Sequence, residues 1–177
     1  ARFARLYGEE QVAAQRARYA DAVRGFVETF GEPAGELMLC SAPGRTEIGG
    51  NHTDHNHGRV LAGSVNLDVI AVVAASDAAR IRVQSKGYPM DTVLLDELQP
   101  VAAEQNHSAS LIRGIAARFE ALGLSVCGFD AYTTSDVLKG SGLSSSAAFE
   151  VLVGVILNHL CNNGSVSAED IAKIAQY

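Results

Sequence analysis

A glycine- and serine-rich stretch in the last third of the chain separates a strand-like segment from a strongly apolar helix. Before it, residues 126–134 alternate in the way of a strand that is covered on at least one face. After it, mostly apolar residues recur at four-residue steps and form two neighbouring rows on a helix. The first row is Ala147, Val151, Val155 and His159, and the second is Ala148, Leu152, Ile156 and Leu160. The chain is therefore expected to build a strand, a tight loop and a largely buried helix in succession.

The glycine- and serine-rich stretch, residues 140–146, has the composition of an anion-binding loop. Backbone N–H groups at the start of a helix lack partners within the helix, and the positive end of the helix dipole lies there. Glycines allow a close approach to phosphate oxygens, while serines add hydroxyl donors or an oxygen ligand for Mg²⁺. We expect nucleotide phosphate to bind Gly140, Ser141, Gly142, Leu143, Ser144, Ser145 and Ser146. The alternative is that these residues only cap a helix after a turn.

Two common nucleotide-binding motifs do not fit this stretch. A Walker A loop ends in Gly-Lys-Ser/Thr, and no such triplet follows Gly140. In a dinucleotide fingerprint the last glycine position would be occupied here by serine, and no clear βαβ unit of about 30 residues surrounds it. These two nucleotide-binding folds are therefore disfavoured.

A second segment, residues 43–58, is rich in hydrogen-bond donors and acceptors and suits a polyhydroxylated ligand. Its polar side chains include Arg45, Glu47, Asn51, His52, Asp54, His55, Asn56 and His57. Asp54 could accept hydrogen bonds from sugar hydroxyls, and His52 could donate or accept them. Arg45 carries a permanent charge that would stabilise a phosphoryl group during transfer.

Two other interpretations of this segment stay open. His52, Asp54, His55 and His57 are all possible metal ligands, although the helical spacing of a His-Glu-x-x-His site is absent. The segment could also be a solvated loop whose histidines and asparagines stabilise local turns.

The remaining patterns predict a single domain with a sheet and covering helices. Helices are expected at residues 11–30 and 108–122, strands at 36–40, 60–75, 81–85 and 92–95, and a loop at 41–58. Ser167, three residues before Asp170, resembles a capping box that begins a last helix.

Composition narrows the class of protein. A chain of 177 residues with 47% hydrophobic content can form one substantial core, burying roughly 70% of the surface that its unfolded form exposes. The net charge of −6 argues against nucleic acid as a partner, and no apolar run approaches the ~18 residues of a membrane span. Cys40, Cys127 and Cys161 are odd in number and widely spaced, which predicts neither a disulfide framework nor a metal site and favours a cytoplasmic location.

The two polar segments together resemble the GHMP small-molecule kinases and, within them, the galactokinases. Residues 43–56 are similar to the galactokinase signature, and residues 140–148 are similar to the second motif of the family. The resemblance implies an α+β fold, the GHMP kinase N-terminal domain (ribosomal protein S5 domain 2-like), with a mixed β-sheet covered by α-helices over residues 1–177. It also implies a C-terminal domain outside this chain, because the chain would be a little under half of a usual family member.

The chemistry implied by the resemblance is ATP-dependent phosphorylation of the anomeric hydroxyl of galactose, which yields galactose 1-phosphate. Position by position, Arg45 resembles the residue that supports the transferring phosphoryl group, and Asn51, His52, Thr53 and Asp54 lie in the sugar-binding motif. Ser146 resembles the Mg²⁺-binding serine, and Ser85 is expected near the nucleotide.

The segment departs from the galactokinase pattern at two positions. Galactokinases usually carry Asn where this chain has Glu47, and Glu where it has Asn51. These departures make a kinase for N-acetylgalactosamine or another sugar an alternative. Two further alternatives are a non-catalytic sensor of galactose and ATP and a purely structural domain. The catalytic aspartate and the Mg²⁺-binding glutamate of the family are expected beyond Tyr177, so residues 1–177 alone are expected to be inactive.

Overall fold

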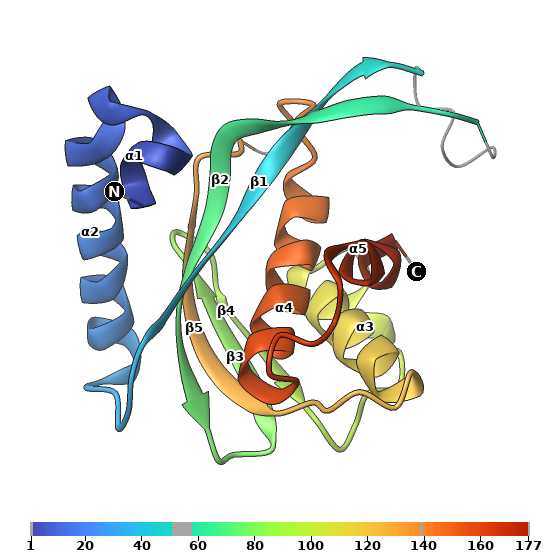
Figure 1. Cartoon of the computed structure of the whole chain (residues 1–177). Coiled ribbons are helices and arrows are strands. Elements are labelled where there is room, and N and C mark those ends of the chain that lie inside the picture. Colours follow the sequence, from blue (N-terminus) through green and yellow to red (C-terminus); the bar gives the residue numbers. More distant parts are fainter. Residues whose placement is uncertain (1, 51–57, 139, 177) are drawn as a thin grey trace.

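The computed structural model describes residues 2–50, 58–138 and 140–176, and within them one sheet lies between two layers of helices (Figure 1). The elements are α1 (Arg2–Tyr7), α2 (Val12–Phe30), β1 (Met38–Gly49), β2 (Leu61–Ser76), β3 (Arg80–Ser85), β4 (Met90–Leu94), α3 (Ser108–Ala121), β5 (Gly128–Ser135), α4 (Ser145–Cys161) and α5 (Ala168–Gln176). Short 3-10 turns occur at Glu9–Gln11 and Ala102–Glu104.

The described sheet has five strands in the order β1-β2-β5-β3-β4. Strand β3 pairs with β5 in parallel, whereas the other neighbours pair antiparallel. Helices α1 and α2 lie on one side of the sheet, and α3, α4 and α5 lie on the other (Figure 1). The predicted α+β class with a mixed sheet covered by helices is therefore confirmed.

The middle of β2 is buried on both faces of the sheet. Residues 69–73 are each at most 4% exposed. Ala71 and Val73 belong to the core shared with α3 and α4, while Ile70 and Val72 belong to a second core that contains Tyr19 and Phe26 of α2. A strand covered on both faces explains the continuous apolar run of its sequence.

The burial of α4 agrees with its sequence pattern in one of the two rows. Ala148, Leu152 and Ile156 are buried, whereas Ala147 and His159 at the ends of the other row are exposed. The predicted capping box at the start of α5 is confirmed as well. The backbone N–H of Asp170 donates to Ser167 Oγ over 3.1 Å, and that hydroxyl donates to the Asp170 carboxylate over 2.8 Å.

The predicted loop at residues 41–58 is wrong in its first half. Strand β1 continues to Gly49, because the N-terminal part of β2 also extends and pairs with it, Thr46 opposite Gly63 and Gly49 opposite Leu61. Pro43 lies in this strand because β1 is at the edge of the sheet, where a proline is tolerated. Helix α1 was also not predicted from the sequence, and its Tyr7 packs into the core on the α2 side.

The expectation for the cysteines is wrong for two of the three. Cys127 and Cys161 form a disulfide with 6.1 Å between their Cα atoms, although 34 positions separate them. They meet because one residue immediately precedes β5 and the other ends α4. Beside them the Asn162 side chain accepts a hydrogen bond from the Ser125 N–H and donates one to its carbonyl, each over 2.9 Å. Cys40 is free and buried, and its burial raises the pKa of the thiol to about 11.

Within the described part of the chain, no helix is both long and apolar enough to cross a membrane.

Substituting Gly25 should destabilise the fold, because α2 approaches β5 closely at this position. A Cβ on Gly25 would lie 2.4 Å from the Tyr132 ring, so Gly25→Ala is expected to cost about 1–3 kcal/mol of unfolding free energy. Gly114→Ala is the matched control, since a Cβ there meets nothing within 4 Å and should stabilise α3 by about 0.5–1 kcal/mol. Denaturant unfolding measures both, and equal effects of the two substitutions would contradict this packing.

Reducing the Cys127–Cys161 disulfide should lower the thermal unfolding temperature. A closed loop of this length corresponds to about 3–4 kcal/mol of chain entropy in the unfolded state. Thermal unfolding with and without a thiol reductant measures the effect, and a variant with serine at both positions should unfold at the lower temperature in either condition. If the reductant does not change the wild-type midpoint, the pair does not form.

Candidate active site

The glycine- and serine-rich stretch forms the connection between β5 and α4. Its backbone has positive φ at Gly140 (79°), Gly142 (77°) and Ser144 (57°), a conformation that favours glycine at the first two positions. A Cβ at either glycine would meet no heavy atom within 4 Å, so the space facing these residues is open. The backbone of the loop is therefore accessible to a ligand.

The loop leads directly into the N-terminus of α4. Ser144 precedes the helix and makes no side-chain capping bond, while its carbonyl accepts a hydrogen bond from the Ala148 N–H over 3.0 Å. Ser145 is half-buried and Ser146 is exposed in the first turn. The first-turn N–H groups of a 17-residue helix and two serine hydroxyls thus meet at an open surface. This donor set fits a phosphate group, and the exposed hydroxyl could add one oxygen ligand for Mg²⁺.

The start of the loop is fixed to the sheet. The Asp136 N–H donates to the Asp68 carbonyl over 3.0 Å. The Ser135 hydroxyl donates to the Val137 carbonyl over 3.0 Å and accepts from the Val137 N–H over 3.1 Å. The chain direction at the exit from β5 is therefore set by hydrogen bonds.

The end of the loop contacts β1, where the polar segment begins. The Arg45 N–H donates to the Leu143 carbonyl over 3.1 Å. A Cβ on Gly44 would approach the same carbonyl to 3.0 Å and the Val137 methyl groups to 3.1 and 3.2 Å. The two motifs that the sequence analysis singled out are thus in direct contact.

Arg45 keeps an accessible side chain at this contact. Its Nη1 lies 4.0 Å from Glu47 Oε2, and the side chains are 36% and 14% exposed respectively. Glu47, one of the two departures from the galactokinase pattern, therefore lies beside the arginine that is expected to support phosphoryl transfer. The carboxylate can orient the guanidinium group without covering it.

Ser85 is the last residue of β3 and lies at the same end of the sheet as the end of β5, from which the loop departs. Parallel pairing sets it opposite Thr133, whose hydroxyl donates to Ser85 Oγ over 2.9 Å. Thr133 is two residues before the end of β5, so Ser85 is close in the sheet to the start of the loop.

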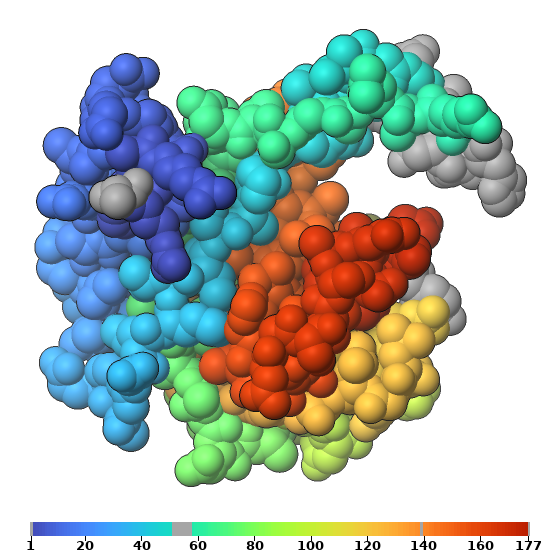
Figure 2. Space-filling view, in the orientation of Figure 1, coloured from blue at the N-terminus to red at the C-terminus, as the bar shows by residue number. Residues whose placement is uncertain are grey.

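The second half of β1 and the first half of β2 form an arm that extends beyond the sheet. Figure 2 shows this arm above α5 with open space between them. The expected sugar-binding residues Asn51, His52, Thr53 and Asp54 lie outside the described residues, as do His55 and His57 of the alternative metal site. In residues 2–50, 58–138 and 140–176, no cluster of three or more His, Cys, Asp or Glu side chains could hold a metal ion.

A buried polar cluster next to the loop was not predicted from the sequence. Asp68, 3% exposed, accepts hydrogen bonds from Tyr7 (2.5 Å), from Arg18 Nη1 (2.6 Å) and from Ser41. We call these four residues, with Asp136, the Asp68 cluster. Burial, and next the hydrogen bond to Asp68, raises the pKa of Tyr7 far above its usual value, so this hydroxyl remains a donor. The sequence signal is an aspartate directly before the apolar run at residues 69–75, because a buried carboxylate requires partners.

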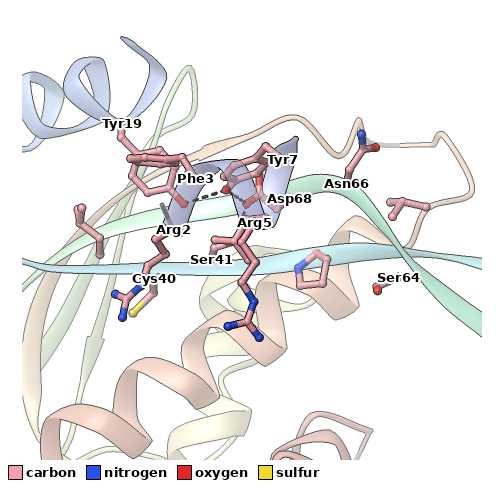
Figure 3. A pocket seen from close by; sticks show the side chains of 14 residues that line it. Arg2, Phe3, Arg5, Tyr7, Tyr19, Cys40, Ser41, Ser64, Asn66 and Asp68 are labelled. Carbon is pink, nitrogen blue, oxygen red and sulfur yellow. Dashed lines mark hydrogen bonds between the residues drawn. The ribbon is translucent and has the colours of Figure 1, made fainter. Parts of the chain in front are cut away.

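A pocket of about 660 Å³ adjoins the Asp68 cluster (Figure 3). Its lining includes Arg2, Arg5, Ser41, Ser64 and Asn66, and it does not include the loop at residues 140–146. Leu39 and Ser41, on the face of β1 opposite the buried Cys40 and Ala42, also line it. The pocket is therefore separate from the α4 N-terminus.

Comparisons with known proteins agree with these two motifs. Residues 24–75 match the galactokinase galactose-binding signature, and residues 110–177 match the N-terminal domain of the GHMP kinases. The structure is similar to that of Lactococcus lactis galactokinase complexed with galactose, with a TM-score of 0.80 and 26% identity over 89% of this chain and 41% of that one.

More distant kinases share the fold. Methanococcus jannaschii mevalonate kinase has a TM-score of 0.65 at 17% identity, over 81% of this chain and 46% of that one. Streptococcus pneumoniae phosphomevalonate kinase in complex with phosphomevalonate and AMPPNP has a TM-score of 0.55 at 22% identity, over 78% and 41% respectively. The chain thus spans less than half the length of each of these structures.

The mixed sheet, the loop at the start of α4 and the matching domain define a GHMP kinase N-terminal domain. Within that class, the chain is similar to the galactokinases, because residues 24–75, which include β1 and most of β2, match their galactose-binding signature.

Proposed function

We propose that the protein carrying this chain is a sugar kinase that transfers the γ-phosphoryl group of ATP to the anomeric hydroxyl of galactose. The observation that carries the proposal is the hydrogen bond from the Arg45 N–H to the Leu143 carbonyl. It joins the first residues of the sugar signature to the phosphate loop, so that one cation and the helix N-terminus can act on the same phosphate chain. Phosphoryl transfer depends mainly on such positioning and on charge stabilisation.

Each part of the described site has a role in this reaction. The first N–H groups of α4 and the hydroxyls of Ser144, Ser145 and Ser146 would hold the nucleotide phosphates. The exposed guanidinium group of Arg45 would neutralise charge that develops on the phosphoryl oxygens. ATP supplies the phosphoryl group, and Mg²⁺, for which Ser146 offers an oxygen ligand, supplies charge neutralisation.

The choice of ligands is supported by the similar structures. The galactokinase was solved with galactose, and the phosphomevalonate kinase was solved with AMPPNP, an analogue of ATP. We assign Asn51, His52, Thr53 and Asp54 to the sugar, and Ser85 to the surroundings of the nucleotide. The proposal includes a cytoplasmic location, where ATP is abundant, although disulfides such as Cys127–Cys161 are rare there.

A kinase for N-acetylgalactosamine or another sugar is the second candidate. Glu47 lies beside Arg45, and Asn51 stands where galactokinases carry a carboxylate. An amide loses the charge-assisted hydrogen bond that a carboxylate makes to a sugar hydroxyl, which would alter the preference among sugars.

Galactose should be the preferred acceptor in the whole protein. We expect kcat/KM for galactose to exceed that for N-acetylgalactosamine and glucose by at least about tenfold, a difference of about 1.4 kcal/mol in transition-state binding. Initial rates of ADP formation across the three sugars measure this. A higher kcat/KM for another sugar would support the second candidate, and nucleotide binding without phosphorylation of any sugar would favour a sensor.

Nucleotide binding should depend on Ser146 through the metal. Isothermal titration with MgADP is expected to show weaker binding by Ser146→Ala than by the wild type, by about tenfold if one metal ligand is lost. Ser141→Ala is a useful comparison within the same loop, because the Ser141 hydroxyl already donates to the Leu138 carbonyl over 2.7 Å. Absence of binding in all three proteins would exclude this loop as a nucleotide site.

A further inference from the structure

We propose that Arg18 and Asp68 are positioning residues for the nucleotide, which act by fixing the start of the phosphate loop through Asp136. The inference rests on the proposed function of that loop. Neither residue lies in the loop or in the polar segment at residues 43–58. Their effect would reach the ligand only through the backbone at residues 136–137.

Arg18 of α2 connects three parts of the chain with one guanidinium group. Its Nη1 lies 2.6 Å from Asp68 Oδ1 and 3.0 Å from Asp136 Oδ2, and its Nη2 donates to the Asp68 carbonyl over 2.9 Å. That carbonyl is also the acceptor for the Asp136 N–H. Asp136 is therefore held by its side chain and by its backbone, directly before the loop begins.

The same carboxylate also holds β1 at the point where the sugar signature begins. Ser41 donates to Asp68, and two residues later Pro43 is paired with Asp68 in the sheet. The register between β1 and β2 shifts between Pro43 and Arg45, so Asp68 marks the last regular pair before that shift. Figure 3 shows Tyr7 and Ser41 close to Asp68, which places α1 and β1 in the same cluster.

Two charged side chains of this cluster are largely buried. The side chains of Arg18 and Asp68 are 14% and 4% exposed, whereas that of Asp136 is 42% exposed. Charges removed from water interact strongly, and loss of one partner leaves the other without compensation. Without Arg18, the Asp136 carboxylate would lose its ion pair, and this exposed side chain could move away from the sheet.

The loop is anchored at both ends, and the Asp68 cluster is one of these anchors. The other is the hydrogen bond between Arg45 and Leu143. If the first anchor is lost, residues 137–142 gain freedom that nucleotide binding must then remove. A displacement of about 1 Å in a positioning group can cost about 100-fold in rate.

The test compares variants of the whole protein with a matched substitution on the same helix. Arg18→Met removes the guanidinium group and its hydrogen bonds, whereas Arg18→Lys keeps the positive charge. Arg24→Met makes the same chemical change at an exposed site of α2, where Arg24 pairs with Asp21. Ile70→Val, two residues from Asp68 in β2, controls for a general loss of stability. For each variant, the KM values for MgATP and for the sugar, the Kd for MgADP and the unfolding midpoint are measured.

Arg18→Met is expected to raise the KM for MgATP and the Kd for MgADP about 10- to 100-fold while the KM for the sugar changes less than about threefold. Arg18→Lys should fall between this variant and the wild type, and Arg24→Met should match the wild type. The proposal is overturned if folded Arg18→Met binds MgADP as tightly as Arg24→Met does. It is also overturned if Ile70→Val, at the same loss of stability as Arg18→Met, loses as much affinity for MgADP as Arg18→Met does. A wild type that binds MgADP but phosphorylates no sugar contradicts only the proposed function, and the binding comparison still decides the role of Arg18.

Discussion

The burial of β2 on both faces is the constraint from which the arrangement of the molecule follows. Residues 69–73 cannot face water, so the chain must provide a helical layer on each side of the sheet. Helix α2 covers one face and α4 the other. Because α4 follows β5 directly, the connection between them must leave the edge of the sheet and enter the covering layer. That turn is the glycine- and serine-rich loop, and it brings the positive end of a helix to an open surface.

Asp68 is located where this buried run begins, next to Val69. A carboxylate at such a position is costly unless it is paired and hydrogen-bonded, and here donors from α1, α2 and β1 satisfy it. These contacts connect α1 and α2, on one face of the sheet, to the loop that leads into α4 on the other face. Stability and the geometry of the candidate site therefore depend on the same contacts.

The sequence predicted the parts of the fold that local patterns encode. One of the two helix rows of α4, the capping box of α5 and the strand at residues 81–85 each depend on residues close together in the chain, and each agrees with the structure. The extension of β1 was not predictable, because Pro43 and Gly44 indicate a loop and only pairing with a distant strand makes them part of a sheet. The disulfide and the Asp68 cluster also depend on contacts between distant residues, and the pattern of a single sequence does not identify those partners.

The candidate site also combines features that local sequence patterns indicate with contacts that only the fold creates. Local composition singled out the glycine- and serine-rich loop and Arg45 as candidates, and the positive φ angles at Gly140 and Gly142 agree with the tight loop that was expected. The contact between Arg45 and Leu143 could not be predicted, since 98 positions separate the two residues. The roles of Asn51, His52, Thr53 and Asp54 stay predictions from the sequence.

Hydrogen exchange of the whole protein with and without MgADP tests the central claim most directly, because it reports where along the chain the nucleotide binds. Protection on binding should be greatest in peptides that cover residues 137–148, the loop and the first turn of α4. Protection confined to other segments, such as the groove lined by Leu111, Arg113 and Glu150 beside α3, would contradict it.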